Sequence, residues 1–293
     1  MIGAEMTDDD RFVSGTAAGV PFVALPPKRT GQPDVPLVVA WHLMDAPASP
    51  AAMASALPME GLDAWRVYLG LPDNGDRLPE GGQDELMRRG YEDAVLRLNV
   101  PIASVGAQEF PGALAELRDR FGLSQDGRLA LVGGSLGSAV VLLTLVEVAR
   151  DAGITVDAAV VISPVAQLRA AVDATGRGFG VEYPWREETA EVEQRFNFVQ
   201  RPPANVPLRA IVGEEDDKEG FLEPARLLVG HWSEASIPAD LVVIPNMAHG
   251  FADAPGFRSA PQTPAGRAVD AATTSWLGHW LYDDQDTGRG GGV

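Results

Sequence analysis

Near the middle of this 293-residue chain, the sequence reads Arg128-Leu129-Ala130-Leu131-Val132-Gly133-Gly134-Ser135-Leu136-Gly137-Ser138. A short apolar run enters a Gly-x-Ser-x-Gly pentapeptide, and a long apolar helix pattern leaves it. This pattern is typical of a strand-to-helix turn that exposes a nucleophilic serine. The glycines are needed because a Cβ would crowd the sharp, strained bend. The stretch makes Ser135 a candidate nucleophile.

The pentapeptide alone also fits a glycine-rich turn that binds phosphate. That alternative is weakened because the stretch lacks the Lys-Ser/Thr ending of a Walker loop and does not fit Gly-x-Gly-x-x-Gly. The rest of the chain has to separate the two interpretations.

Short strand patterns alternate with helix patterns along the chain, which predicts an α/β protein with a mostly parallel sheet flanked by helices. The predicted strands are 12–14 and 20–25 as an antiparallel pair, then 35–41, 65–71, 128–134, 157–162, 208–212 and 240–244. The predicted helices are 49–57, 83–98, 110–121, 136–152, 187–198, 222–235 and 263–282. Residues 1–293 are expected to form one domain.

Two segments depart from this alternation. Residues 164–207 hold no clear strand, and a structureless loop of that length is improbable in a compact domain. We therefore expect a small inserted helical cap there. Residues 283–293 are polar and glycine-rich, which predicts a frayed tail.

The composition excludes several classes of function. A net charge of −18 argues against nucleic acid and anionic membrane surfaces as partners. The absence of cysteine removes disulfides, thiolate metal sites and cysteine catalysis. The first residues lack the apolar core of a signal peptide, and the longest strongly apolar stretch, 136–148, is too short to span a bilayer. A soluble, cytoplasmic protein is expected.

A serine nucleophile needs a base, and the chain offers four histidines for that role. His249 lies on a predicted loop after a strand and before the last helix, which suits a general base. His231 and His279 lie inside helix patterns beside tryptophans and are interpreted as packing or surface residues.

The base in turn needs an acid that holds its tautomer. Four carboxylates, Glu214, Glu215, Asp216 and Asp217, follow the predicted strand 208–212. A solvated acidic loop explains several of them, but one can still orient the histidine. The order serine, acid, histidine then places each group after a strand.

Taken together, these motifs resemble the α/β-hydrolase family over about residues 10–282. The resemblance implies the α/β-hydrolase fold with Ser135 as nucleophile, Asp216 as acid and His249 as base. The family's Gly-x-x-Asp spacing from Gly213 favours Asp216 over Asp217.

The resemblance also implies an oxyanion loop at 41–45, where the family usually has His-Gly. Here the loop reads Trp41-His42-Leu43-Met44-Asp45, so Leu43 replaces the glycine. By position, the donors are the backbone N–H groups of Met44 and Leu136, with Leu43 or Asp45 as alternatives to Met44. His42 is expected to be a structural histidine, bonded to the backbone behind the loop.

The function implied is a carboxylesterase-type serine hydrolase that acts on a small-molecule acyl substrate and needs no metal and no organic cofactor. Three aromatic residues in the cap would line an apolar pocket, or they would merely pack the cap onto the domain: Phe179, Tyr183 and Trp185. One alternative is a thioesterase or acyltransferase, whose anionic carrier would need a basic entrance such as Arg169, Arg177, Arg186 and Arg195. Another is a hydrolase-fold protein that binds or cyclises a ligand without net hydrolysis.

Overall fold

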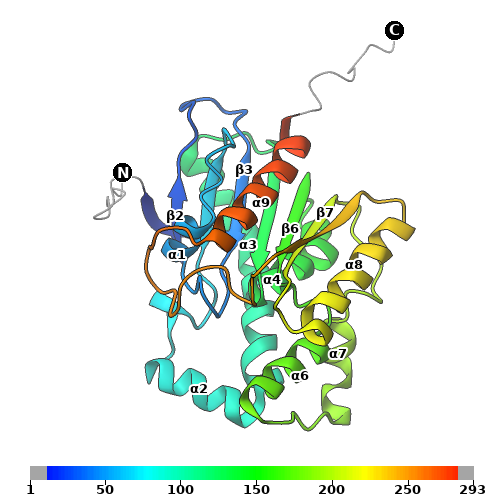
Figure 1. Cartoon of the computed structure of the whole chain (residues 1–293). Helices are drawn as coiled ribbons and strands as arrows, with labels where there is room; N and C mark the ends of the chain where they lie inside the picture. The colour runs from blue at the N-terminus through cyan, green and yellow to red at the C-terminus, as the bar shows by residue number, and fades with distance from the viewer. Residues whose placement is uncertain (1–11, 283–293) are drawn as a thin grey trace.

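The computed structural model describes residues 12–282, and Figure 1 shows their arrangement. An eight-stranded sheet in the order β1-β2-β4-β3-β5-β6-β7-β8 forms the centre. Its strands are β1 (Val13–Ala17), β2 (Val20–Leu25), β3 (Leu37–Trp41), β4 (Trp65–Leu69), β5 (Leu129–Gly134), β6 (Ala158–Ile162), β7 (Leu208–Gly213) and β8 (Ala239–Ile244). β1 and β2 pair antiparallel, β2 pairs antiparallel with β4, and the other pairs are parallel. The mostly parallel sheet predicted from the sequence is confirmed.

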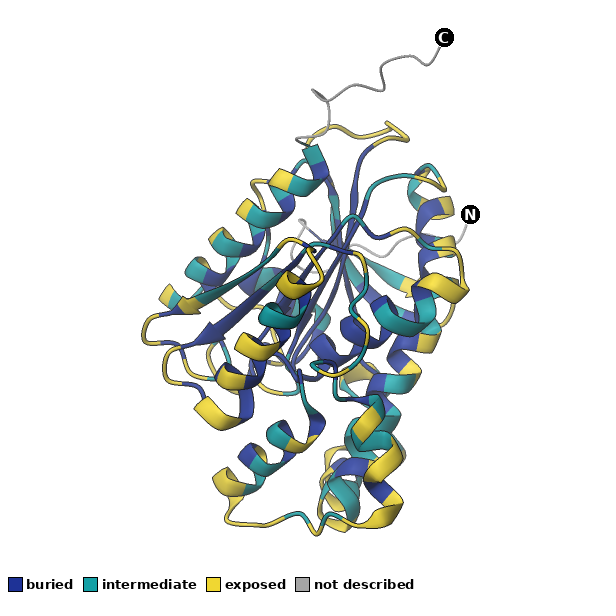
Figure 2. Ribbon diagram, turned by 90° about the vertical axis from the view of Figure 1, so that its right-hand side faces the viewer, coloured by how far each residue is buried: buried dark blue, intermediate teal, exposed yellow. Residues whose placement is uncertain are grey.

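The central strands are apolar throughout because both faces of the sheet are covered. Every residue of β3, β5 and β6 is buried, as the dark strands of Figure 2 show. One face packs against α1 (Pro50–Ala56) and α9 (Pro264–Tyr282). The other packs against α3 (Val100–Phe121), α4 (Leu136–Leu143) and α8 (Glu223–Glu234). The sheet therefore has a separate apolar core on each side.

The helix that follows Ser135 is buried on all sides, as its apolar sequence predicts. All residues of α4 are buried, and the helix continues through η3 (Thr144–Val148) and α5 (Ala149–Asp151). At the start of α1, Ser49 caps the helix by accepting a hydrogen bond from the Ala52 N–H, and Pro50 follows it at the first helical position.

Helix α3 is longer than the sequence predicted. The helix predicted at 110–121 begins instead at Val100 and carries Pro111 in its interior. Ile102, Ala107 and Phe110 are buried in the core of that face, so apolar packing holds the extra turns in place. Tertiary packing therefore outweighs the low helix propensity of Pro111.

Two segments leave the carboxyl edge of the sheet. Residues between β4 and α3 form η1 (Gly75–Arg77), α2 (Gly82–Asp93) and η2 (Ala94–Asn99). Residues between β6 and β7 form α6 (Leu168–Phe179), η4 (Glu187–Thr189) and α7 (Ala190–Arg195), so the second helix there ends earlier than the predicted 198. α2, α6 and α7 gather at the lower end of the molecule in Figure 1. The remaining helix, η5 (Lys218–Leu222), follows β7, and the predicted tail at 283–293 lies outside the described residues.

Candidate active site

Ser135 stands on a sharp turn between β5 and α4. Its backbone has φ 45° and ψ −117°, a conformation that side chains rarely adopt. Such a backbone costs about 1–3 kcal/mol and persists only where surrounding structure enforces it. The Ser135 N–H donates to the Ile162 carbonyl at 2.8 Å, which fixes the turn against β6. The strained residue is half-exposed and lies at the carboxyl edge of the sheet.

The two outer glycines of the pentapeptide are required by close backbone approach. A Cβ on Gly133 would lie 2.2 Å from the Gly137 carbonyl oxygen, and a Cβ on Gly137 would lie 2.6 Å from the His42 carbonyl oxygen. No real Cβ tolerates such contacts, and the blocking atoms are backbone. The turn can therefore form only with glycine at both positions.

The structure brings the predicted serine, histidine and acid together. The Ser135 Oγ lies 2.8 Å from His249 Nε2, and His249 Nδ1 lies 3.1 Å and 3.2 Å from the two carboxylate oxygens of Asp216. An imidazole that accepts a hydrogen bond from the hydroxyl at Nε2 carries its own proton at Nδ1. The Nδ1–H group then donates a hydrogen bond to the carboxylate. This is the geometry that activates a serine hydroxyl.

Of the two partners in the His249–Asp216 hydrogen bonds, the acid is the more deeply buried. The His249 side chain is 23% exposed, whereas that of Asp216 is only 2% exposed. The buried carboxylate faces one nitrogen of the imidazole, and the other nitrogen faces Ser135. The ring of Phe221 lies against His249 with centroids 4.2 Å apart, which limits how far the imidazole can swing.

Asp217, the alternative acid, is engaged elsewhere. Its carboxylate accepts from the Gly220 N–H at 2.7 Å and pairs with Arg177 at 2.7 Å. Its pKa is held below the usual range by the hydrogen bonds of Arg177 and Gly220, which outweigh the opposing effect of burial. The geometry therefore favours Asp216 as the partner of His249.

The loop after β3 has two amides available for an oxyanion. The Leu43 N–H donates to the Pro47 carbonyl, and the Ala46 N–H donates to the Asp45 carboxylate at 2.8 Å. Among the described residues, the N–H groups of Met44 and Asp45 have no protein acceptor, and neither does that of Leu136 at the start of α4. The predicted pair Met44 and Leu136 is thus available, and the Asp45 carboxylate is bound within its own loop.

His42 has the structural place expected of it. The Leu71 N–H donates to Nε2 at 3.2 Å, so Nδ1 carries the proton and donates to the Leu43 carbonyl at 2.5 Å. Complete burial lowers the His42 pKa to about 4. The neutral ring thereby ties the loop that carries Met44 to the residues that follow β4.

The lowered pKa predicts a pH-dependent stability. Because the unfolded chain binds a proton near pH 6.5 and the folded chain only near pH 4, the free energy of unfolding should fall as the pH drops through that window. The contribution from His42 is about 3 kcal/mol. Urea unfolding of the wild type and of His42→Asn at pH 7 and pH 4.5 measures it. Equal losses in both proteins would show that His42 does not contribute.

Comparison with solved structures places this geometry in a known fold. The Thermus thermophilus protein TT1662 matches with a TM-score of 0.62 and 18% identity, over 93% of this chain and 98% of that chain. An esterase from Pyrobaculum calidifontis matches with a TM-score of 0.61 and 17% identity, over 91% of this chain and 83% of that one. An acylaminoacyl peptidase from Pyrococcus horikoshii matches with a TM-score of 0.62 and 14% identity, over 97% of this chain but 43% of its own.

The chain has the α/β-hydrolase fold. Esterases and acylaminoacyl peptidases such as those two belong to this superfamily. No sequence model of a protein family matches the chain, and no curated protein sequence matches it. At these identities the likeness establishes the fold alone.

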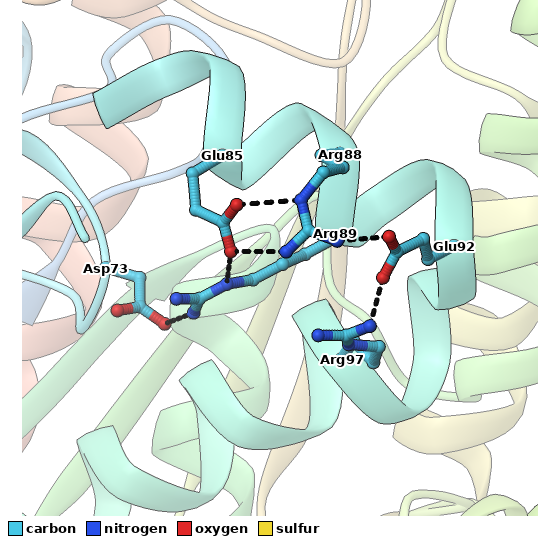
Figure 3. Close-up of polar contacts among 6 residues, drawn as sticks. All are labelled: Asp73, Glu85, Arg88, Arg89, Glu92 and Arg97. Atoms are coloured by element: carbon cyan, nitrogen blue, oxygen red, sulfur yellow. Dashed lines mark hydrogen bonds and ion pairs between the residues drawn. The ribbon is translucent and has the colours of Figure 1, made fainter. Parts of the chain in front are cut away.

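Ion pairs run along α2 and link it to the neighbouring segments. Figure 3 shows Glu85 between Arg88 and Arg89, while Glu92 joins Arg88 to Arg97 on η2. Arg89 also reaches back to Asp73, 3.1 Å away in the loop after β4. These side chains are partly solvent-exposed, so each pair contributes little stability. Their collective effect is to neutralise the arginines and tether α2 to the loop at its base.

The three aromatic residues predicted to line a pocket have different surroundings. Phe179 is 70% exposed at the end of α6. The Tyr183 hydroxyl donates to Asp93 at 2.7 Å, and the Trp185 Nε1 donates to Asp173 at 2.7 Å. Tyr183 and Trp185 also contact each other edge to face, with ring centroids 4.7 Å apart. Tyr183 therefore joins the segment after β6 to the segment after β4, whereas Trp185 bonds within its own segment.

The structure adds site neighbours that the sequence analysis missed. Phe221 contacts the ring of His249, and the Ser163 hydroxyl donates to the His249 carbonyl at 2.9 Å. Ser163 directly follows β6, so its place at the carboxyl edge of a strand was a signal that could have been used. Nothing in the sequence marked Phe221, because its contact with His249 depends on the path that η5 takes after β7.

Neither a membrane span nor a metal cluster is found among residues 12–282. Within that range, no helix has the length and apolar character needed to cross a bilayer. The same residues contain no group of three or more His, Cys, Asp and Glu side chains placed to hold a metal ion.

Proposed function

We propose that this protein is a serine hydrolase of the carboxylesterase type, which cleaves esters of small or medium apolar acids through an acyl-enzyme intermediate. One observation carries the proposal: the Ser135 hydroxyl lies 2.8 Å from an imidazole that is itself held by a buried carboxylate. Ser135 stands on a strained turn at the carboxyl edge of the sheet, and a hydroxyl, an imidazole and a carboxylate in this relation form the arrangement that activates a serine for attack.

The mechanism follows from the hydrogen bonds. Ser135 Oγ attacks the ester carbonyl carbon as His249 Nε2 takes its proton, and the imidazolium is stabilised by Asp216. The oxygen that becomes negative is held by the N–H groups of Met44 and Leu136, with the positive end of the α4 helix dipole behind Leu136. His249 then protonates the leaving alcohol, and water releases the acid by the reverse sequence.

The charge of the segment after β6 favours a neutral substrate over an acyl group on an anionic carrier. Arg169, Arg177 and Arg195 are each paired with a carboxylate: Glu193, Asp217 and Glu147 respectively. Neutralised guanidinium groups attract an anionic carrier weakly, and the net charge of −18 repels it. An ester substrate is therefore preferred over a thioester on a phosphorylated carrier.

The test is a screen of p-nitrophenyl esters of increasing acyl length, together with labelling by a fluorophosphonate probe. We expect labelling at Ser135 and turnover that is highest for short to medium chains. Faster turnover of matched p-nitroanilides would instead indicate a peptidase. A protein that is labelled at Ser135 but turns over no ester or amide would favour a cyclase. A protein that is not labelled would refute the proposal.

Residues 164–207 are proposed to act as a cap that selects substrate. The segment leaves the sheet directly after β6, at the edge where ligands bind in open α/β sheets. If Trp185 lines the pocket, Trp185→Ala should change the ratio of kcat/KM between short and bulky esters by about tenfold.

A purely structural role predicts a different result for Trp185. The ring bonds to Asp173 and stacks under Arg169, whose guanidinium carbon is 4.3 Å from the ring centroid. Loss of those contacts would lower the melting temperature and reduce kcat/KM by the same factor for every substrate. Measuring kcat/KM for an acetyl and a benzoyl ester, with Tm alongside, separates the two roles.

A further inference from the structure

Helix α6 of the proposed cap docks closely on η5, the short helix after the triad acid. A Cβ on Gly220 would lie 2.3 Å from the Ala174 Cβ and 3.3 Å from the Ala170 carbonyl oxygen. Phe221, the next residue of η5, lies against the imidazole of His249. One short helix therefore touches the cap on one side and the catalytic base on the other.

Ion pairs from Arg177 link the two helices at this junction: its guanidinium pairs with Asp217 and also lies 3.6 Å from the carboxylate of Glu219, which is 83% exposed. The Arg177 guanidinium, on the last turn of α6, donates to both carboxylate oxygens of Asp217 at 2.7 Å and 3.3 Å. Asp217 in turn caps η5 by accepting from the Gly220 N–H at 2.7 Å. Its own backbone N–H donates to Asp216 Oδ1 at 2.8 Å. Asp217 thus bonds the cap, η5 and the triad acid at once.

The hydrogen bond from the Asp217 N–H fixes one of the oxygens that faces His249. Asp216 Oδ1 accepts from this N–H and also lies 3.2 Å from His249 Nδ1. A small shift of the Asp217 backbone would rotate the carboxylate and move η5, which carries Phe221. Misplacement of a reacting group by about 1 Å can cost up to 10²-fold in rate.

We propose that Arg177 and Asp217 are positioning residues that hold Asp216 and His249 in their working geometry through η5. The inference rests on the proposed serine hydrolase function. In this arrangement the cap helps to hold the residues that activate Ser135, in addition to any contact that the cap has with substrate.

Arg169 provides a matched control because it lies on the same helix. The side chains of Arg169 and Arg177 are both 46% exposed, and each donates to a carboxylate at 2.7 Å. Arg169, however, pairs with Glu193 on α7, inside the cap. Removing either ion pair should cost a similar, small amount of stability because both are partly solvent-exposed. Only the Arg177 pair leads to the triad.

The experiment measures the rate of labelling by a small fluorophosphonate in the full-length wild type and in Arg177→Met, Asp217→Asn and Arg169→Met. A small probe reports on nucleophile activation with little dependence on the cap as a binding surface. We expect Arg177→Met and Asp217→Asn to be labelled about five- to tenfold more slowly and Arg169→Met to match the wild type. The double variant Arg177→Met/Asp217→Asn should lose no more than either single one, because the pair acts as a unit. Arg177→Lys should recover part of the rate.

Other outcomes overturn the inference. Labelling of Arg177→Met at the wild-type rate, or a loss no larger than that of Arg169→Met, would show that the pair only stabilises the cap. A loss that follows a fall in Tm and disappears on cooling by 15 °C would show the same. A wild type that is not labelled refutes the proposed function itself, which distinguishes that failure from the failure of this inference.

Discussion

Ser135→Ala is expected to lower kcat/KM for a p-nitrophenyl ester by about 10⁴-fold or more and to abolish fluorophosphonate labelling. The reason is that the hydroxyl is the one nucleophile held 2.8 Å from the imidazole of His249. His249→Ala should cost nearly as much, and the double variant should lose little more, because the groups act as a unit. Steady-state kinetics on the three variants at one pH measures this.

Stability is the control for these variants. Ala at 135 keeps the same strained backbone, and Ser135 is only half-buried, so the melting temperature should change by a few degrees at most. Activity above about a tenth of the wild-type value in a correctly folded Ser135→Ala protein would remove Ser135 from the role of nucleophile.

The sequence predicted those parts of the fold whose local signals agree with the tertiary structure. The turn at Ser135 is one, because glycines are imposed on it by backbone contacts that no other residue can satisfy. The buried strands and α4 are another, since burial on all sides needs an unbroken apolar run. His249 and the acidic group after β7 could be found because loops at the carboxyl edge of parallel strands converge.

The parts that the sequence did not predict depend on contacts between distant segments. Nothing local marks the Tyr183 hydroxyl as the partner of Asp93, which lies 90 residues away. The segment after β4 was predicted as one helix, yet Asp93 divides it by accepting hydrogen bonds from the Val95 and Leu96 N–H groups at the start of η2. Such features follow from packing at the carboxyl edge rather than from periodicity.

The choice among four neighbouring carboxylates shows the same limit. Spacing from Gly213 favoured Asp216, but a solvated acidic loop would have the same composition. The structure separates them by burial and partner: Asp216 is buried and faces His249, whereas Asp217 faces Arg177. These different partners give the two aspartates different expected roles.

Asp216→Asn is therefore expected to lower kcat by about 10³- to 10⁴-fold, whereas Asp217→Asn should cost about tenfold or less. An amide at 216 cannot hold the imidazolium by charge, and its NH₂ group can turn toward Nδ1 and force the wrong tautomer. An amide at 217 can still accept from the Gly220 N–H, so η5 stays capped and only the pairing with Arg177 is lost. Both substitutions preserve size, which makes them a matched pair, and Tm should be compared before kcat. The reverse ranking, with Asp217→Asn the more damaging in a folded protein, would move the acid role to Asp217 and require His249 to turn from the position it has here.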